Sequence, residues 1–156
     1  MAVALFLAGA TPLAIQFCKI LIADRNRHVR EFLRRELTAE GYRVEMVGDG
    51  RELLAKLQGK DPPHLLILDL DLPYLNELEI WARITDRRPP LPVVVHSFLP
   101  EYPTHLTVPE AAAFLEKQGD TDQLKSVVAE VIEKNYRQRA RKRIRNPDGG
   151  KRKKSM

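Results

Sequence analysis

Short apolar runs alternate along the chain with segments whose apolar residues recur every three or four positions. Such runs are typical of strands buried on both faces, and the segments between them of amphipathic helices. The alternation predicts an α/β fold, a doubly wound sheet of five parallel strands with helices on both of its faces. The expected strands are residues 19–24, 42–47, 65–68, 93–95 and 112–117.

Three internal helices are expected between these strands. Gly41 is the expected stop of the first helix, because glycine readily adopts the left-handed conformation that follows many helices. The positions expected to face the core are Val29, Phe32, Leu33 and Leu37 in the first helix, Leu53, Leu54 and Leu57 in the second, and Leu75, Leu78, Trp81 and Ile84 in the third.

The stretch from Ser97 to Ala111 is rich in proline. It contains Pro100, Pro103 and Pro109, and a proline inside a helix costs about 3 kcal/mol. We therefore expect the fourth helix, between the last two strands, to be short or absent.

Polar residues follow four of the expected strands. These residues are Asp24, Asp69, Ser97 and Lys117. Because ligands of parallel sheets bind at the carboxyl ends of the strands, we expect the four side chains to converge there. Two carboxylates suit a divalent cation, whereas a hydroxyl and an ammonium suit phosphoryl oxygens. Asp69 follows the central apolar strand and is the expected nucleophile for an aspartyl phosphate.

Four stretches together resemble the receiver domain of two-component response regulators, over residues 19–134. They are KILIAD, HLLILDLDLP, PVVVHS and AFLEK. The resemblance implies a flavodoxin-like receiver fold, Mg²⁺ as a cofactor, and phosphorelay signalling between a histidine kinase or other phosphodonor and a downstream protein. It assigns Asp69 as the phosphoacceptor, Ser97 as the switch hydroxyl, Phe114 as the switch aromatic and Lys117 as the phosphate-binding lysine.

The acidic pocket departs from this resemblance at one position. Receivers usually carry two adjacent acids after the first strand, and here Asp24 is followed by Arg25. A guanidinium cannot coordinate a metal, and it can form a bidentate ion pair with Asp69. Asp71 either restores the lost negative charge or neutralises Arg25. We therefore expect Mg²⁺ binding and Mg²⁺-dependent phosphorylation to be impaired.

Two residues beside the switch hydroxyl also carry expectations. His96 is interpreted as a hydrogen-bonded core or edge histidine rather than a general base. Phe98 takes the place of a small residue, and it either narrows the entry path for a phosphodonor or serves only in packing.

Three functions remain open at this stage. The leading hypothesis is a stand-alone receiver-like signalling protein without a catalytic output domain, in which Asp69 accepts phosphate. An alternative is a pseudo-receiver that acts as a phosphorylation-independent protein-interaction adaptor. The segment LLILDLDLP also resembles the nucleophile motif of haloacid-dehalogenase-type phosphatases. That family normally opens its core with this strand, and here a complete strand precedes it.

The net charge of +5 divides into two opposite parts. Residues 134–156 hold 11 Lys and Arg against one acid, or +10, so residues 1–133 carry −5. A segment of this kind attracts nucleic acid or anionic lipid without sequence specificity. The last helix of the chain is expected to be capped by Asp120 or Thr121, to continue into this basic segment and to end before Asn146. The candidate polyanion-binding residues are Arg137, Arg139, Arg141, Lys142, Arg143 and Arg145.

The first 18 residues contain no charged side chain. A signal peptide needs a positively charged start, and a membrane-spanning helix needs about 20 apolar residues. We therefore expect an apolar extension over residues 1–18, a receiver-like domain over 19–133 and a basic helical extension over 134–156, in a cytoplasmic protein.

Overall fold

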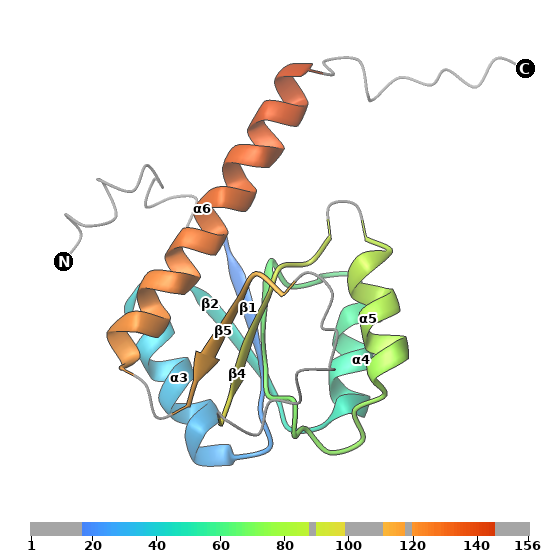
Figure 1. The fold of residues 1–156 in the computed structure, drawn as a ribbon, viewed down its shortest axis with the longest axis vertical. Coiled ribbons are helices and arrows are strands. Elements are labelled where there is room, and N and C mark those ends of the chain that lie inside the picture. Colours follow the sequence, from blue (N-terminus) through green and yellow to red (C-terminus); the bar gives the residue numbers. More distant parts are fainter. Residues whose placement is uncertain (1–16, 88–89, 99–110, 118–119, 146–156) are drawn as a thin grey trace, which may run out of the picture.

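The computed structural model describes residues 17–87, 90–98, 111–117 and 120–145. Its five parallel strands form one sheet in the order β2-β1-β3-β4-β5, which confirms the predicted doubly wound α/β fold (Figure 1). The strands are β1 (Lys19–Ala23), β2 (Arg43–Val47), β3 (Leu65–Leu68), β4 (Val93–Ser97) and β5 (Ala113–Glu116), and the helices are α3 (Arg27–Ala39), α4 (Gly50–Gln58), α5 (Glu77–Thr85) and α6 (Thr121–Arg145).

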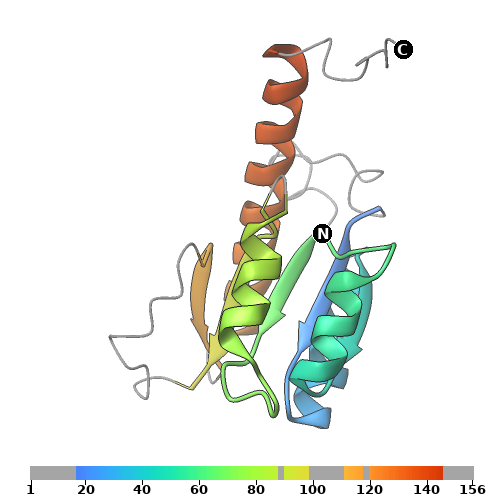
Figure 2. The ribbon, with the colours of Figure 1, turned by 90° about the vertical axis from the view of Figure 1, so that its right-hand side faces the viewer.

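Two helices cover each face of the sheet (Figures 1 and 2). Because side chains alternate along a strand, Ile20 and Ile22 pack in one core cluster with residues of α3 and α6. Leu21 and Ala23 pack in a second cluster with residues of α4 and α5. The inner strands β1, β3 and β4, which are buried throughout, thus need apolar residues on both faces, and this explains their apolar runs in the sequence.

The strand order reverses between β1 and β3. The chain passes from β1 to β2 on one side and returns to β3 on the other, and Ala23 pairs with Val47 in β2 and with Leu68 in β3. Parallel sheets bind ligands at such a switch point, beyond the carboxyl ends of the strands. Asp24 and Asp69 are the residues that follow β1 and β3.

The ends of α3 follow from local chemistry. The Asn26 side chain accepts hydrogen bonds from the backbone N–H groups of His28 and Val29, which have no partner inside the helix. At the other end, Gly41 has a φ of 100°, a conformation that is strained for other residues. The predicted glycine stop is therefore confirmed.

The predicted core faces of two helices are partly wrong. Leu78 of α5 is 86% exposed and Phe32 of α3 is 40% exposed, whereas Ile80 and Ile84 are buried. The helix α5 begins at Glu77, and the face turned toward the sheet runs through residues four positions apart, so Leu78 lies on the opposite side. Trp81 packs partly buried against the core, as expected.

The structure tests the remaining predictions for the fold unevenly. The strand β4 extends to Ser97, two residues beyond the predicted end. The proline-rich stretch that bears on the fourth helix, residues 99–110, and the extension 1–16 lie outside the described residues. Among the helices that are described, none is long and apolar enough to cross a membrane.

Gly50 offers a direct test of the packing between α4 and the loop after β3. A Cβ atom added at Gly50 would lie 2.1 Å from the backbone oxygen of Tyr74, whereas one added at Gly59 has its nearest neighbour at 3.4 Å. We expect Gly50→Ala to lower the free energy of unfolding by about 1–3 kcal/mol. Gly59→Ala is the matched control and should stay within about 0.5 kcal/mol of the wild type in urea unfolding. Equal effects of the two substitutions would contradict the close approach at Gly50.

Candidate functional site

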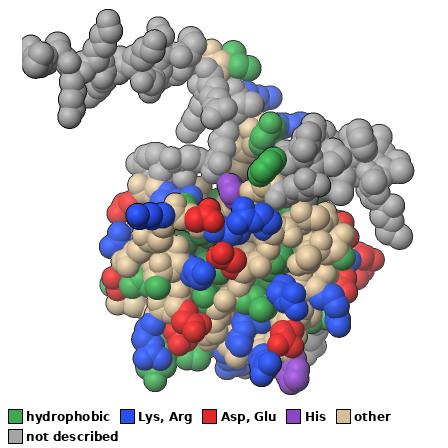
Figure 3. Space-filling model, turned by 180° about the vertical axis from the view of Figure 1, so that it is seen from behind, with side chains coloured by type: hydrophobic (Ala, Val, Ile, Leu, Met, Phe, Trp, Pro, Cys, Tyr) green, Lys and Arg blue, Asp and Glu red, His purple; other side chains and the backbone are tan. Residues whose placement is uncertain are grey.

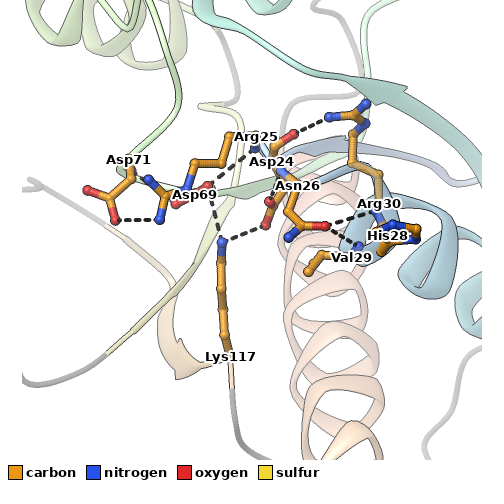
Figure 4. Close-up of polar contacts among 9 residues, drawn as sticks. All are labelled: Asp24, Arg25, Asn26, His28, Val29, Arg30, Asp69, Asp71 and Lys117. Carbon is orange, nitrogen blue, oxygen red and sulfur yellow. Dashed lines mark hydrogen bonds and ion pairs between the residues drawn. The ribbon is translucent and has the colours of Figure 1, made fainter.

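Lys117 joins two buried carboxylates at the carboxyl edge of the sheet (Figure 4). Its Nζ lies 2.9 Å from Oδ2 of Asp24 and 3.1 Å from Oδ2 of Asp69, and the three side chains are 4%, 2% and 0% exposed. Asp24 follows β1, Asp69 follows β3 and Lys117 follows β5. The structure thus brings together three of the residues singled out in the sequence.

Backbone N–H groups complete the hydrogen bonding of the two carboxylates. Oδ2 of Asp69 accepts from the N–H of Arg25 at 3.3 Å, and Oδ1 accepts from the N–H of Asp71 at 3.0 Å. Oδ1 of Asp24 accepts from the N–H of Asn26 at 2.8 Å. The loops after β1 and β3 therefore fix the positions of both carboxylates beside Lys117.

The Arg25 guanidinium points to Asp71. Its Nη2 lies 3.9 Å from Oδ2 of Asp71, and both side chains are about half exposed. The bidentate ion pair with Asp69 that the sequence suggested is absent among the described contacts, because the side chain of Asp69 is already fully buried against Lys117. Of the two roles considered for Asp71, the geometry matches neutralisation of Arg25.

This charge arrangement bears on the Mg²⁺ expected from the resemblance. No group of three or more His, Cys, Asp or Glu side chains in the described parts of the chain has the geometry of a metal site. Asp24 and Asp69 share Lys117 as their cation, and Asp71 faces Arg25. A hard divalent cation needs several oxygen ligands that are not already neutralised. The residues present are therefore poorly suited to a divalent cation.

The other two residues assigned by the resemblance lie on the neighbouring strands β4 and β5. Ser97 is buried at the end of β4, and its carbonyl accepts a hydrogen bond from the N–H of Lys117 at 2.9 Å. Phe114 lies on the edge strand β5 and is half exposed. The ring centroid of Phe98 lies 5.3 Å from Lys117 Nζ, a cation–π distance. Phe98 therefore contacts the cation of the site directly.

His96 differs from its sequence interpretation. It is only 7% exposed, as expected of a core histidine, but its Nδ1 has no hydrogen-bond partner among the described residues. The side chain lines a small cavity of about 110 Å³ together with Phe32, Lys117 and Leu124. Burial, with the nearby charge of Lys117, lowers the pKa of His96 below its usual value, although Asp24 and Asp69 oppose this effect. The expected core position of His96 is therefore confirmed, whereas its expected hydrogen bonding fails at Nδ1 within the described part of the chain.

One side chain that supports the site was missed from the sequence. Nη1 of Arg30 donates a hydrogen bond of 2.7 Å to the backbone oxygen of Asp24 and thereby holds the loop after β1. The only sequence signal for Arg30 is its place on the first turn of the following helix. A long arginine there has many possible partners, so the contact depends on the tertiary arrangement.

Comparison of the chain with known protein families agrees with the arrangement of Asp24, Asp69 and Lys117 at the switch point. The family model of the response regulator receiver domain matches residues 20–129. The chain belongs to this family. Receiver domains of response regulators function in two-component signalling, and the resemblance noted in the sequence is confirmed.

Curated relatives match part of the receiver domain. The response regulator MprA of Mycolicibacterium vanbaalenii is 42% identical over 77 residues, which make up 49% of this chain and 33% of the relative. MprA of Mycobacterium leprae is 40% identical over 77 residues, with the same coverage. The matched region thus spans about a third of the length of these relatives.

Solved structures share the fold of this receiver domain. A CheY-like receiver domain protein from Methanospirillum hungatei superposes with a TM-score of 0.68 at 21% identity, over 78% of this chain and 98% of that one. NtrX from Brucella abortus, crystallised with ATP, gives a TM-score of 0.71 at 26% identity, over 88% of this chain and 32% of that one. A complex of the Thermotoga maritima protein TrrA with Mg²⁺-BeF superposes with a TM-score of 0.62 at 28% identity, over 72% of this chain and 96% of that one.

Removing the ammonium group of Lys117 should lower the stability of the folded protein. We expect Lys117→Met to lower the free energy of unfolding by about 3–5 kcal/mol, because it leaves Asp24 and Asp69 buried without a cation. Lys125→Met is the matched control, since Lys125 pairs with Glu36 at 2.8 Å on the surface, and it should cost about 1 kcal/mol or less. Adding Asp69→Asn to Lys117→Met should recover part of the loss. Similar urea midpoints for Lys117→Met and Lys125→Met would contradict the role of the cluster in stability.

The lowered pKa of His96 predicts a dependence of stability on pH. Below about pH 6.5 the unfolded chain binds a proton at this residue that the folded protein does not, so stability should fall as the pH falls from about 7 to 5. His96→Leu should flatten this part of the profile, measured by urea unfolding at each pH. His28→Gln, at an exposed position on α3, should leave the profile unchanged. A profile that His96→Leu does not alter would refute the assignment.

Proposed function

We propose that Asp69 is the phosphoacceptor of this receiver domain and that a histidine kinase or another phosphodonor supplies the phosphoryl group. The contact of Asp69 with Lys117 at 3.1 Å carries the proposal. It places an ammonium beside the carboxylate that is to be phosphorylated, at the switch point of the sheet. Phosphoryl transfer depends largely on such positioning and on stabilisation of charge.

The proposed transfer from acetyl phosphate is a displacement at phosphorus. A carboxylate oxygen of Asp69 forms a bond to phosphorus while the bond between phosphorus and the acetate oxygen breaks, and acetate leaves with the electron pair. Lys117 neutralises charge on the phosphoryl oxygens, and the Ser97 hydroxyl donates a hydrogen bond to one of them. Groups that cover Asp69 must move aside for a donor to arrive, because the side chain of Asp69 is 0% exposed.

Arg25 slows this reaction in our proposal. It stands where receivers usually carry a metal-binding acid, and its guanidinium is 3.9 Å from the neighbouring carboxylate of Asp71. The site consequently has less uncompensated negative charge to hold Mg²⁺. A bound metal ion contributes several kcal/mol of charge stabilisation to reactions at phosphoryl groups, so its weak binding predicts slow phosphorylation.

One observation favours a second candidate function, a phosphorylation-independent interaction adaptor. Asp69 has no exposed side-chain surface, and it already shares the ammonium of Lys117 with Asp24. A receiver locked in this arrangement still presents its helices and the edge strand β5 to partner proteins. In that case signalling depends on a protein contact alone, and Asp69 serves to hold the fold together.

Intact-mass measurement after incubation with Mg²⁺ and acetyl phosphate separates the two candidates. We expect a slowly formed, base-labile adduct on the wild-type chain that is absent in Asp69→Asn. Arg25→Asp should form the adduct about tenfold faster or more, because it restores an acid at the metal-binding position. Arg27→Asp is the matched control, since Arg27 is an exposed residue two positions away, and it should behave like the wild type.

The alternative outcomes are equally distinct. An adduct that persists in Asp69→Asn would place the acceptor elsewhere and overturn the assignment of Asp69. If neither the wild type nor a folded Arg25→Asp variant takes phosphate, the adaptor replaces the phosphoacceptor as the function. Equal acceleration by Arg25→Asp and Arg27→Asp would show that overall charge, rather than the acidic pocket, controls the rate.

A further inference from the structure

The last three turns of α6 extend beyond the core of the receiver domain. The helix has 25 residues, a length of about 37 Å, and the last of its core residues is Val131, followed by the partly buried Ile132. Beyond them Tyr136 is 57% exposed and Ile144 is 79% exposed. Figures 1 and 2 both show this end of α6 projecting away from the sheet.

The projecting segment, residues 134–145, is densely cationic. It contains seven Lys and Arg and no acid within 12 residues, or about 18 Å of helix. Lys134, Arg137, Arg141 and Arg145 are all exposed, and Figure 3 shows basic and hydrophobic side chains on this part of the molecule. Arg137 is paired with Glu133 at 2.6 Å, at the base of the segment.

The spacing of these charges weakens the helix in the absence of a bound anion. Arg141 lies four residues from both Arg137 and Arg145, and like charges at that spacing repel each other and destabilise a helix. Core packing does not compensate, because these residues are exposed. An anionic partner would remove the repulsion, so charge complementarity indicates which kind of partner the segment fits.

We propose that residues 134–145 bind the phosphate backbone of duplex nucleic acid. A DNA duplex carries about one negative charge per 1.7 Å, so 18 Å of helix faces about ten phosphates. An α-helix with its side chains is about 10–12 Å in diameter and fits the major groove, which is about 12 Å wide. The segment projects beyond the strands of the sheet in the views of Figures 1 and 2, so its exposed cations can approach a groove.

The distribution of charge favours a duplex over a membrane surface. At 100° per residue, the exposed cations at positions 134, 137, 141 and 145 fall in one arc of about 80°. The side chains at positions 139, 142 and 143 lie outside the described ones. A row of cations along the helix matches the row of phosphates along the wall of a groove. A membrane contacts one side and needs a broad apolar face, and the apolar residues of the segment are Tyr136, Ala140 and Ile144.

The predicted binding depends on backbone contacts and not on base recognition. Tyr136 is the only aromatic residue of the segment, so stacking on single-stranded bases is not favoured. Affinity should therefore be similar for duplexes of unrelated sequence and should fall steeply with salt. The proposal does not rest on phosphotransfer to Asp69, and either function can fail without the other.

Fluorescence anisotropy with a labelled DNA duplex of about 20 base pairs tests the proposal on the full chain. Between about 50 and 200 mM salt we expect log K to fall with log salt with a slope of about −3 to −6. Arg137→Gln/Arg141→Gln/Arg145→Gln should weaken binding about tenfold or more and reduce the slope by about 2 to 3. Glutamine keeps a good helix propensity, so circular dichroism should show the helix retained.

A matched control removes the same charge from the receiver domain. Arg27→Gln/Arg34→Gln/Arg83→Gln changes three exposed arginines on α3 and α5 and should leave binding within about threefold of the wild type. Equal losses in the two triple variants, or wild-type chain that does not bind at about 50 mM salt, would overturn the proposal. Binding to phosphatidylserine vesicles that the tail variant abolishes, without any binding to duplex DNA, would replace the duplex by a membrane.

Discussion

The salt bridge of Lys117 with Asp24 and Asp69 is the interaction on which the site depends. One ammonium lies within 3.1 Å of two carboxylates in a place where all three side chains are almost inaccessible to water. Charges cannot remain buried there singly, because desolvation costs several kcal/mol for each ion. The loops after β1, β3 and β5 must therefore keep their mutual positions, and this constraint ties the chemistry of the site to the stability of the fold.

Arg25 changes what this receiver domain does with that cluster. In the structure its guanidinium faces Asp71 rather than Asp69, so Asp69 keeps Lys117 as its partner, while the pocket as a whole loses negative charge. The site thus keeps an acid and a lysine in contact at the switch point and is poorly suited to a divalent cation.

Much of the fold could be predicted because its signals are local and repeated. The apolar runs that end at Asp24 and Asp69 indicate strands buried on both faces, and the glycine stop at Gly41 follows from backbone conformation alone. The convergence of Asp24, Asp69 and Lys117 follows from the geometry of any parallel sheet. The core face of α5 could not be assigned in this way, since Leu78 fits the helical spacing but the packing of α5 on the sheet buries Ile80 instead.

The sequence by itself determined which strands are followed by an acid, a hydroxyl or a lysine at the carboxyl edge of the sheet. It also determined the division of the chain into an acidic domain and a basic extension. Only the tertiary structure decided the partners of these charges. Arg25 has several carboxylates within the reach of a long side chain, and burial of Asp69 against Lys117 leaves Asp71 as its partner. The contact of Arg30 with Asp24 has the same origin, as does the lack of a partner for Nδ1 of His96 among the residues that the structure describes. Ion pairs and hydrogen bonds depend on distances of a few ångströms between elements far apart in the chain, and those distances are fixed by packing.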